Sequence, residues 1–220
     1  MLRFVKTAAA ALAGLLMITG LATAAPITIN FTGAVDQFNP GPFTSNVALS
    51  GQITLDDTVV ATGPNNSFNN AITGFSLTIS EPGGPYTYTN DGTGGRVQQF
   101  IGAGNTQFIS VAFGGNAPGT FISPAGAPEL TSFDIDFRGT DLFADPTVLA
   151  TGLTEPDFSF AFMSTRFLTN GVSQLMVERR LDTATFSGER QTVAIPAPGA
   201  ALILALGLIG LCGTARSRRV

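Results

Sequence analysis

Hydrophobic residues occur at every second position through most of the middle of the chain. Ile27, Ile29 and Phe31 would share one face of an extended strand, and segment 47–55 repeats this spacing with Val47, Leu49, Gly51, Ile53 and Leu55. The same alternation recurs in six later segments: 75–80, 107–113, 130–137, 158–163, 175–179 and 184–188. Such a pattern predicts strands with one buried face and one polar face.

Glycine, asparagine and proline separate these segments. The stretches 61–70, 81–86, 90–95 and 114–119 have the composition of tight turns. We therefore expect about nine or ten strands, and no helix between Pro26 and Thr192. Many short strands with few helices favour an all-β fold, here an antiparallel β-sandwich or jelly roll. No linker divides the region, which predicts one domain over residues 25–192.

The alternation is absent from the first two dozen residues. Arg3 and Lys6 precede an apolar run from Ala8 to Leu21, and small residues follow at Ala22 and Ala24. A basic start, a short apolar stretch and a small-residue cleavage site are typical of a secretory signal peptide. We assign it to residues 1–24; an uncleaved anchor helix is the alternative.

Composition limits the chemistry of the exported domain. The 220 residues include no histidine and no tryptophan, and the single cysteine, Cys212, lies in the C-terminal tail. Histidine-based triads, thiol catalysis and histidine- or cysteine-bound zinc are therefore excluded from the domain. Without the two ends, six arginines face all fifteen acidic residues, a net charge of −9. This acidic domain argues against nucleic-acid partners, because nucleic-acid binding depends on neutralising phosphates. We expect no cofactor and no enzymatic activity.

Four aspartates form the most suggestive acidic group. Asp134 and Asp136 share the polar face of one strand, and Asp141 and Asp145 follow shortly after. Calcium binds several such oxygens, so these residues are candidate metal ligands. The alternative is a solvated strand face whose opposite side packs in the core.

Two tyrosines form a second candidate site. Tyr86 and Tyr88 would lie on one face of a strand, where exposed rings stack on sugars. Packing in the core or at a sheet edge is the alternative, since tyrosine is common in strands.

The tail contains a second apolar segment. Residues 191–215 carry no charge, and the 20 residues 196–215 would span a bilayer as a helix. Pro198 suits the first turn of such a helix. Arg216, Arg218 and Arg219 would hold its far end in the cytoplasm, following the positive-inside rule.

The order of these features resembles the PEP-CTERM sorting signal. The matching residues are Pro196, Ala197 and Pro198, then the apolar helix, then the three terminal arginines. Ala197 stands where the family commonly has glutamate, so this is a Pro-Ala-Pro variant. The resemblance covers residues 193–220. It implies a Gram-negative exporter, transient anchoring in the inner membrane and processing by an exosortase-type enzyme. It further implies delivery to the cell surface or extracellular matrix, with exopolysaccharide as a further partner.

The sequence therefore predicts a non-catalytic exported surface or matrix protein. A carbohydrate-binding β-sandwich module is the alternative, and a glycan-processing hydrolase is the third hypothesis.

Overall fold

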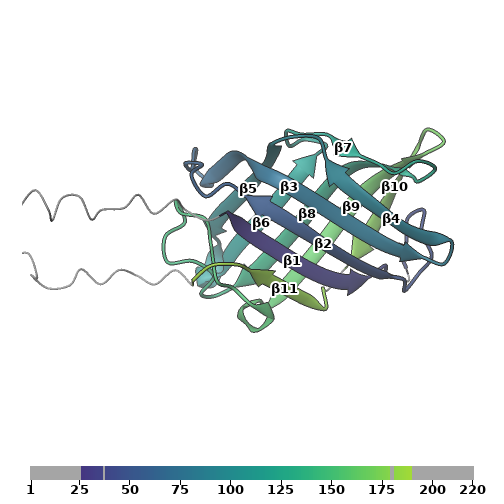
Figure 1. Cartoon of the computed structure of the whole chain (residues 1–220). Coiled ribbons are helices and arrows are strands. Elements are labelled where there is room, and N and C mark those ends of the chain that lie inside the picture. Colours follow the sequence, from purple (N-terminus) through teal and green to yellow (C-terminus); the bar gives the residue numbers. More distant parts are fainter. Residues whose placement is uncertain (1–25, 37, 179–180, 190–220) are drawn as a thin grey trace, which may run out of the picture.

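A computed structural model of the chain describes residues 26–36, 38–178 and 181–189. Eleven strands in this part form one antiparallel sheet, with the order β10-β9-β8-β6-β5-β3-β2-β1-β11; β4 pairs with β3 and with β7 (Figure 1). The strands are β1 (Ile27–Ala34), β2 (Ala48–Leu55), β3 (Ser67–Glu81), β4 (Gly84–Asn90), β5 (Gly94–Ile101), β6 (Gln107–Gly114), β7 (Phe121–Ile122), β8 (Glu129–Gly139), β9 (Phe160–Thr169), β10 (Val172–Glu178) and β11 (Thr183–Phe186). Helical structure in this part is limited to two 3-10 turns, η1 (Ala103–Asn105) and η2 (Glu155–Asp157).

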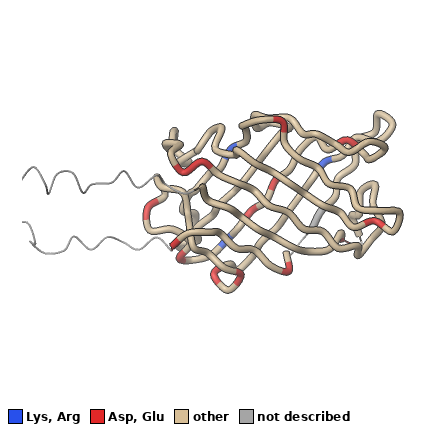
Figure 2. The backbone as a smooth tube through the Cα atoms, in the orientation of Figure 1, with Lys and Arg blue, Asp and Glu red and all other residues tan. Residues whose placement is uncertain are grey.

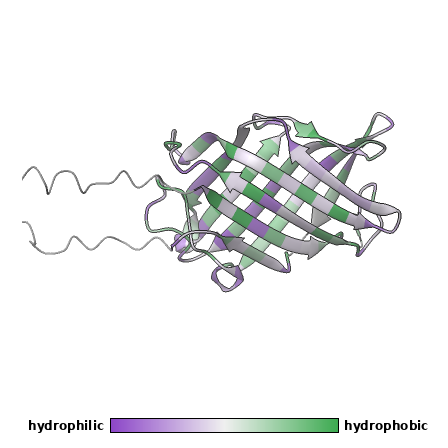
Figure 3. Cartoon of the chain, viewed as in Figure 1, coloured by the Kyte–Doolittle hydropathy of each residue, from purple (hydrophilic) through white to green (hydrophobic). Residues whose placement is uncertain are grey.

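The expected all-β, antiparallel class is confirmed. Apolar and polar positions alternate along the strands, as Figure 3 shows. In β1, Ile27, Ile29 and Phe31 are buried, and in β8 Phe133, Ile135 and Phe137 are buried. The pattern in the sequence therefore identified the inward side of these strands correctly.

The sheet curls until its two ends face each other. The long strand β3 lies at the turn: Ser67–Asn69 pair with β5, whereas Ser76–Glu81 pair with β4. A register shift interrupts the pairing with β5 between Asn69 and Ile72, and Asn70 there has a φ of 59°. Such an irregularity bends a strand and increases its twist. It lets one continuous sheet supply both walls of the core.

The chain after β10 ties the two ends of the sheet together. The amide of Leu181 donates to the carbonyl of Ala161 in β9, at 3.3 Å, and the next amide, of Asp182, donates to Thr32 in β1, at 2.8 Å. An isolated bridge between Pro40 and Met176 adds a second link. The β9 side and the β1 side are thus joined by backbone hydrogen bonds as well as by side-chain packing.

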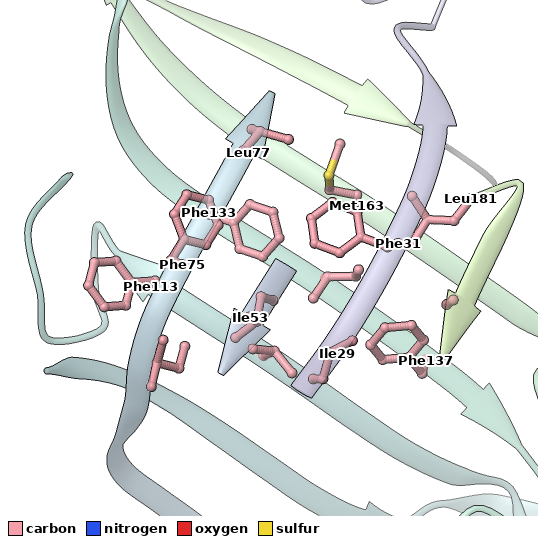
Figure 4. Packing of buried hydrophobic residues seen from close by; sticks show 14 of the residues in the cluster. Ile29, Phe31, Ile53, Phe75, Leu77, Phe113, Phe133, Phe137, Met163 and Leu181 are labelled. Atoms are coloured by element: carbon pink, nitrogen blue, oxygen red, sulfur yellow. The ribbon is translucent and has the colours of Figure 1, made fainter. Parts of the chain in front are cut away.

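Phenylalanine dominates the core between these walls (Figure 4). The ring of Phe133 from β8 lies 5.8 Å from Phe31 of β1 and 4.8 Å from Phe75 of β3. Gly51 of β2 provides room for Phe31: a Cβ at position 51 would lie 2.2 Å from the Cζ of that ring. Gly51 and Phe31 are cross-strand partners, so the Phe31 ring occupies the space that a side chain at position 51 would take.

The segment after β8 covers one end of the core. Leu142, Phe143, Leu149 and Leu153 in it are buried. Two glutamines hold its backbone: Gln107 accepts from the amides of residues 142 and 143, and Gln99 accepts from Ala150 and donates to the carbonyls of residues 146 and 148. Gln99 is fully buried, and these bonds satisfy both its side-chain amide and the backbone groups of the loop.

The predicted signal peptide and C-terminal helix fall outside the described residues. Within residues 26–36, 38–178 and 181–189, no helix has the length and apolar character needed to cross a bilayer.

Candidate functional site

One outer face of the sheet collects every basic residue of the described part. Arg96, Arg138 and Arg166 are the only basic side chains within residues 26–36, 38–178 and 181–189, and no lysine occurs there. Each occupies an outward position on β5, β8 or β9. Acidic residues are spread more widely over the molecule (Figure 2). We call the outward side chains of β5, β6, β8 and β9 the arginine face: Arg96, Gln98, Phe100, Phe108, Ser110, Ala112, Ser132, Asp134, Asp136, Arg138, Phe160, Phe162, Ser164 and Arg166.

Strand register arranges these side chains in rows. Phe100 lies opposite Phe108, Phe108 opposite Arg138, and Arg138 opposite Phe160, so four strands contribute to one row. Another row contains Arg96, Ala112, Asp134 and Ser164. Residues two apart on a strand are about 7 Å apart, which separates neighbouring rows.

The first row is a stack of planar groups. The rings of Phe100 and Phe108 are nearly parallel, with centroids 4.8 Å apart. The guanidinium carbon of Arg138 lies 5.2 Å from the centroids of both Phe108 and Phe160. Cation–π contacts of this kind contribute about 0.5–1 kcal/mol each at exposed sites. Because the groups cover one another's flat faces, this row forms a wall and leaves little ring surface on which a sugar can stack.

A cleft of about 460 Å³ lies at the other end of the arginine face. Its volume is in the range of small-molecule sites. Arg96, Asp134 and Arg166 are its charged residues. Its other lining residues are mostly small: Ala112, Gly114, Gly115, Asn116, Ala117, Ser132, Phe133 and Ser164. The hollow exists because small side chains stand between larger ones, as Ala112 does between Arg96 and Asp134.

A tight turn after β6 fixes one wall of this cleft. Gly114 and Gly115 have φ angles of 69° and 59°, a conformation that favours glycine. The amide of Gly115 donates to Thr131 at 3.0 Å, and the amide of Ala117 donates to Gly114 at 2.9 Å. A Cβ at position 114 would lie 2.7 Å from the carbonyl oxygen of Thr131. The wall therefore requires glycine at this position.

The electrostatics of the cleft centre on Asp134. Burial and the neighbouring carboxylate of Asp136 raise the pKa of Asp134 to about 6, against smaller lowering effects of Ser110 and Arg96. The Ser110 hydroxyl donates to its Oδ1 at 3.4 Å, a long hydrogen bond. The buried Nε of Arg96 has no hydrogen-bond partner.

The four candidate metal ligands, Asp134, Asp136, Asp141 and Asp145, do not come together. The described residues contain no group of three or more acidic, histidine or cysteine side chains placed to hold a metal ion. Asp134 and Asp136 share the arginine face, but Asp141 and Asp145 lie in the loop after β8. Asp145 accepts from the amide and the hydroxyl of Thr147, at 2.8 and 2.7 Å, which lowers its pKa. Its carboxylate stabilises the local turn.

The tyrosine pair does not form a sugar-binding surface. Tyr88 is fully buried, with its ring 5.4 Å from Phe167, and burial raises the pKa of its hydroxyl. Tyr86 is partly buried, 6.4 Å from Phe43. Both rings point to the inner side of β4, as the packing alternative requires, because alternate residues of a strand share a face.

The sorting residues Pro196, Ala197, Pro198, Arg216, Arg218 and Arg219 lie outside the described part of the chain.

Sequence reasoning did not single out Arg96, Arg138 or Arg166. The available signal was that each arginine occupies a polar position of a strand; the sequence did not reveal that the three strands lie in one layer.

Comparison of the chain with protein-family models, with curated proteins and with solved structures gave no match.

Proposed function

We propose that this chain is a non-catalytic exported protein of the cell surface or extracellular matrix, with a β-sandwich passenger domain. The observation that carries the proposal is the position of the two ends of the folded part. The amide of Thr28 donates to the Ser187 hydroxyl at 2.7 Å, and the amide of Ser187 donates to the Thr28 carbonyl at 2.8 Å. The first and last strands therefore begin and end side by side (Figure 1).

This arrangement suits a domain that is held by one end. In the proposal, residues 1–24 direct export, and residues 193–220 hold the protein transiently in the inner membrane of a Gram-negative cell. An exosortase-type enzyme then processes the tail near Pro196–Pro198. In this proposal, the arginine face is the surface that meets a partner such as exopolysaccharide.

A charge-reversal variant tests the sorting step. Replacing Arg216, Arg218 and Arg219 by glutamate should remove the positive-inside signal, so unprocessed protein should no longer be retained in the inner membrane. The matched control replaces the same three residues by lysine, which keeps the charge and should keep normal processing. Cell fractionation and immunoblotting measure both. Unchanged processing in the glutamate variant contradicts the proposal.

A glycan-binding function is the second candidate, and the cleft on the arginine face favours it. The cleft offers charged, hydroxyl and amide groups in a volume of about 460 Å³, which suits a ligand rich in hydroxyl groups. It replaces the tyrosine pair as the candidate binding surface. Incubating the chain with glycans and assaying for new reducing ends tests the non-catalytic part of the proposal; release of reducing ends would favour a hydrolase instead.

A further inference from the structure

We propose that the cleft between Arg96 and Arg166 binds the carboxylate of a uronic-acid residue within a glycan chain. The inference rests on the glycan-binding candidate and narrows its ligand to acidic sugars. It does not depend on how the protein is sorted.

Positive charge in the described part is confined to one outer face of the sheet. The described part contains fifteen acidic residues and three arginines, and all three arginines lie on one face. Two of them, Arg96 and Arg166, line the same cleft. In a domain this acidic, an anionic ligand has few places where it meets positive charge at short range, and the cleft combines two guanidinium groups.

Arg96 gives the cleft a planar hydrogen-bond donor. Its side chain is only partly buried and lines the cleft. A guanidinium presents its N–H groups as a planar fork that matches a carboxylate with two parallel hydrogen bonds. A ligand carboxylate in the cleft can accept hydrogen bonds from this fork.

The other polar side chains of the cleft favour a sugar over a bare anion as the ligand. Asp134 lies in the cleft with Ser132 and Ser164. Its carboxylate accepts hydrogen bonds from hydroxyl groups, which a sugar supplies and a bare anion such as sulfate lacks. A uronic acid carries both a carboxylate for the arginines and hydroxyls for Asp134 and the serines.

The arginine face also allows the glycan to extend beyond the cleft. The neighbouring row holds Gln98, Ser110, Asp136 and Phe162, about 7 Å along the strands. The stack around Arg138 stands one row further. On β5, β6 and β8, polar contacts therefore continue away from the cleft as far as the stacked row, whereas β9 presents the ring of Phe162.

A glycan array with matched pairs tests the ligand class. Each uronate-containing chain is printed beside its carboxyl-reduced form, which keeps the sugar and removes the charge. The probe is the purified full-length chain in a non-ionic detergent. We expect binding to one or more uronate chains, at least ten-fold weaker for the reduced form. Equal binding to both forms overturns the carboxylate assignment but leaves glycan binding standing. Binding to neither form overturns both.

Variants test the location. Titration calorimetry with the best uronate chain should show at least a ten-fold loss of affinity for Arg96→Gln and for Arg166→Gln. Arg96→Lys keeps the charge but loses the planar fork, so it should fall between Arg96→Gln and the unmodified chain. The matched control is Arg138→Gln, which removes the same charge from the same face outside the cleft and should change affinity less than two-fold.

Arg166 is exposed, so its substitution leaves the core intact even if the change at Arg96 disturbs folding. Unchanged affinity in Arg166→Gln, or an equal loss in Arg138→Gln, overturns the placement of the carboxylate in the cleft.

Discussion

The two outer faces of the curled sheet use the same alternating backbone for opposite chemistry. On β1, β2, β3, β4 and β11, the outward residues are mainly threonine, serine, asparagine and glutamine; we call this the hydroxyl face. Its side chains pair with one another: Thr32 with Thr183 at 2.7 Å, Gln52 with Asn30 at 2.9 Å, and Thr78 with Thr87 at 3.0 Å. The arginine face instead combines charges, aromatic rings and a cleft.

The polar side chains of the hydroxyl face find hydrogen-bond partners within that face, whereas some polar groups of the arginine face do not. Cross-strand pairs of neutral polar groups stabilise a sheet modestly and satisfy their own hydrogen bonds. The arginine face retains an unpaired buried Arg96 Nε and a partly buried Asp134 with a raised pKa. Perturbed groups in a cleft are indicators of a functional site. We therefore expect changes on the hydroxyl face to be nearly silent, and changes on the arginine face to alter binding or pH dependence.

The largest expected effect comes from the core that both faces share. Phe133→Ala removes a ring that contacts Phe31 and Phe75, so it should lower the free energy of unfolding by about 3–5 kcal/mol. The control, Phe160→Ala, removes the same side chain from the exposed arginine face. Urea unfolding followed by circular dichroism should show a much smaller loss for the control. Similar losses would mean that the inner and outer sides of the sheet are not energetically distinct.

A smaller core effect is expected beneath the hydroxyl face. Gly51→Ala places a Cβ 2.2 Å from the Phe31 ring, and the resulting displacement should cost about 1–3 kcal/mol. Gly83→Ala is the matched control, because no heavy atom lies within 4 Å of a Cβ there. The same unfolding measurement checks both. An unchanged stability for Gly51→Ala would show that Phe31 moves without penalty.

The sequence predicted the strands best where burial and hydropathy agree. Alternation identified the buried faces of β1 and β8 residue by residue. It did not identify β5, because this strand buries Gln99 and turns Phe100 outward. Both departures have tertiary causes: Gln99 holds the loop after β8, and Phe100 stacks on Phe108. Neither partner is adjacent in the sequence, so local pattern alone could not reveal the strand.

The candidate site was less predictable than the fold. Asp134 and Asp136 were recognised as an outward acidic pair, but the proposed ligands Asp141 and Asp145 do not join them. The cleft depends on Arg96, Asp134 and Arg166, which come from three strands up to 70 residues apart in the sequence. Their meeting follows from strand order and register, which hydropathy does not encode.

Titration of Asp134 should distinguish the arginine face by its pH dependence. Its pKa of about 6 lies above the ordinary 3.8, so the folded state binds this proton more tightly than the unfolded state. The resulting stability is fully present below pH 3.8 and is lost as the pH rises through 6. Since the carboxyl is partly solvated, we expect roughly 1 kcal/mol. Asp134→Asn should remove this decline and stabilise the protein at pH 8.

Asp145→Asn is the control of opposite sign. Hydrogen bonds from Thr147 lower the pKa of Asp145, so its contribution is present above the ordinary pKa and is lost as the pH falls through the lowered one. Its removal should therefore reduce stability at neutral pH. Urea titrations from about pH 2 to pH 8 cover the titration of both groups; an unchanged slope in Asp134→Asn would contradict the raised pKa.

The smallest expected effect belongs to the hydroxyl face. Replacing Thr78 and Thr87 together by valine removes both partners of one cross-strand hydrogen bond and keeps the branched shape that strands favour. Because no polar atom is left unpaired by the change, the free energy of unfolding should move by less than about 0.5 kcal/mol. Uronate binding should be unchanged, since neither residue lines the cleft. The single variant Thr78→Val is the control, because it leaves the Thr87 hydroxyl without this partner. It should be no more stable than the double variant. A loss of glycan affinity in the double variant would show that the hydroxyl face also takes part in recognition, and would end the distinction between the two faces.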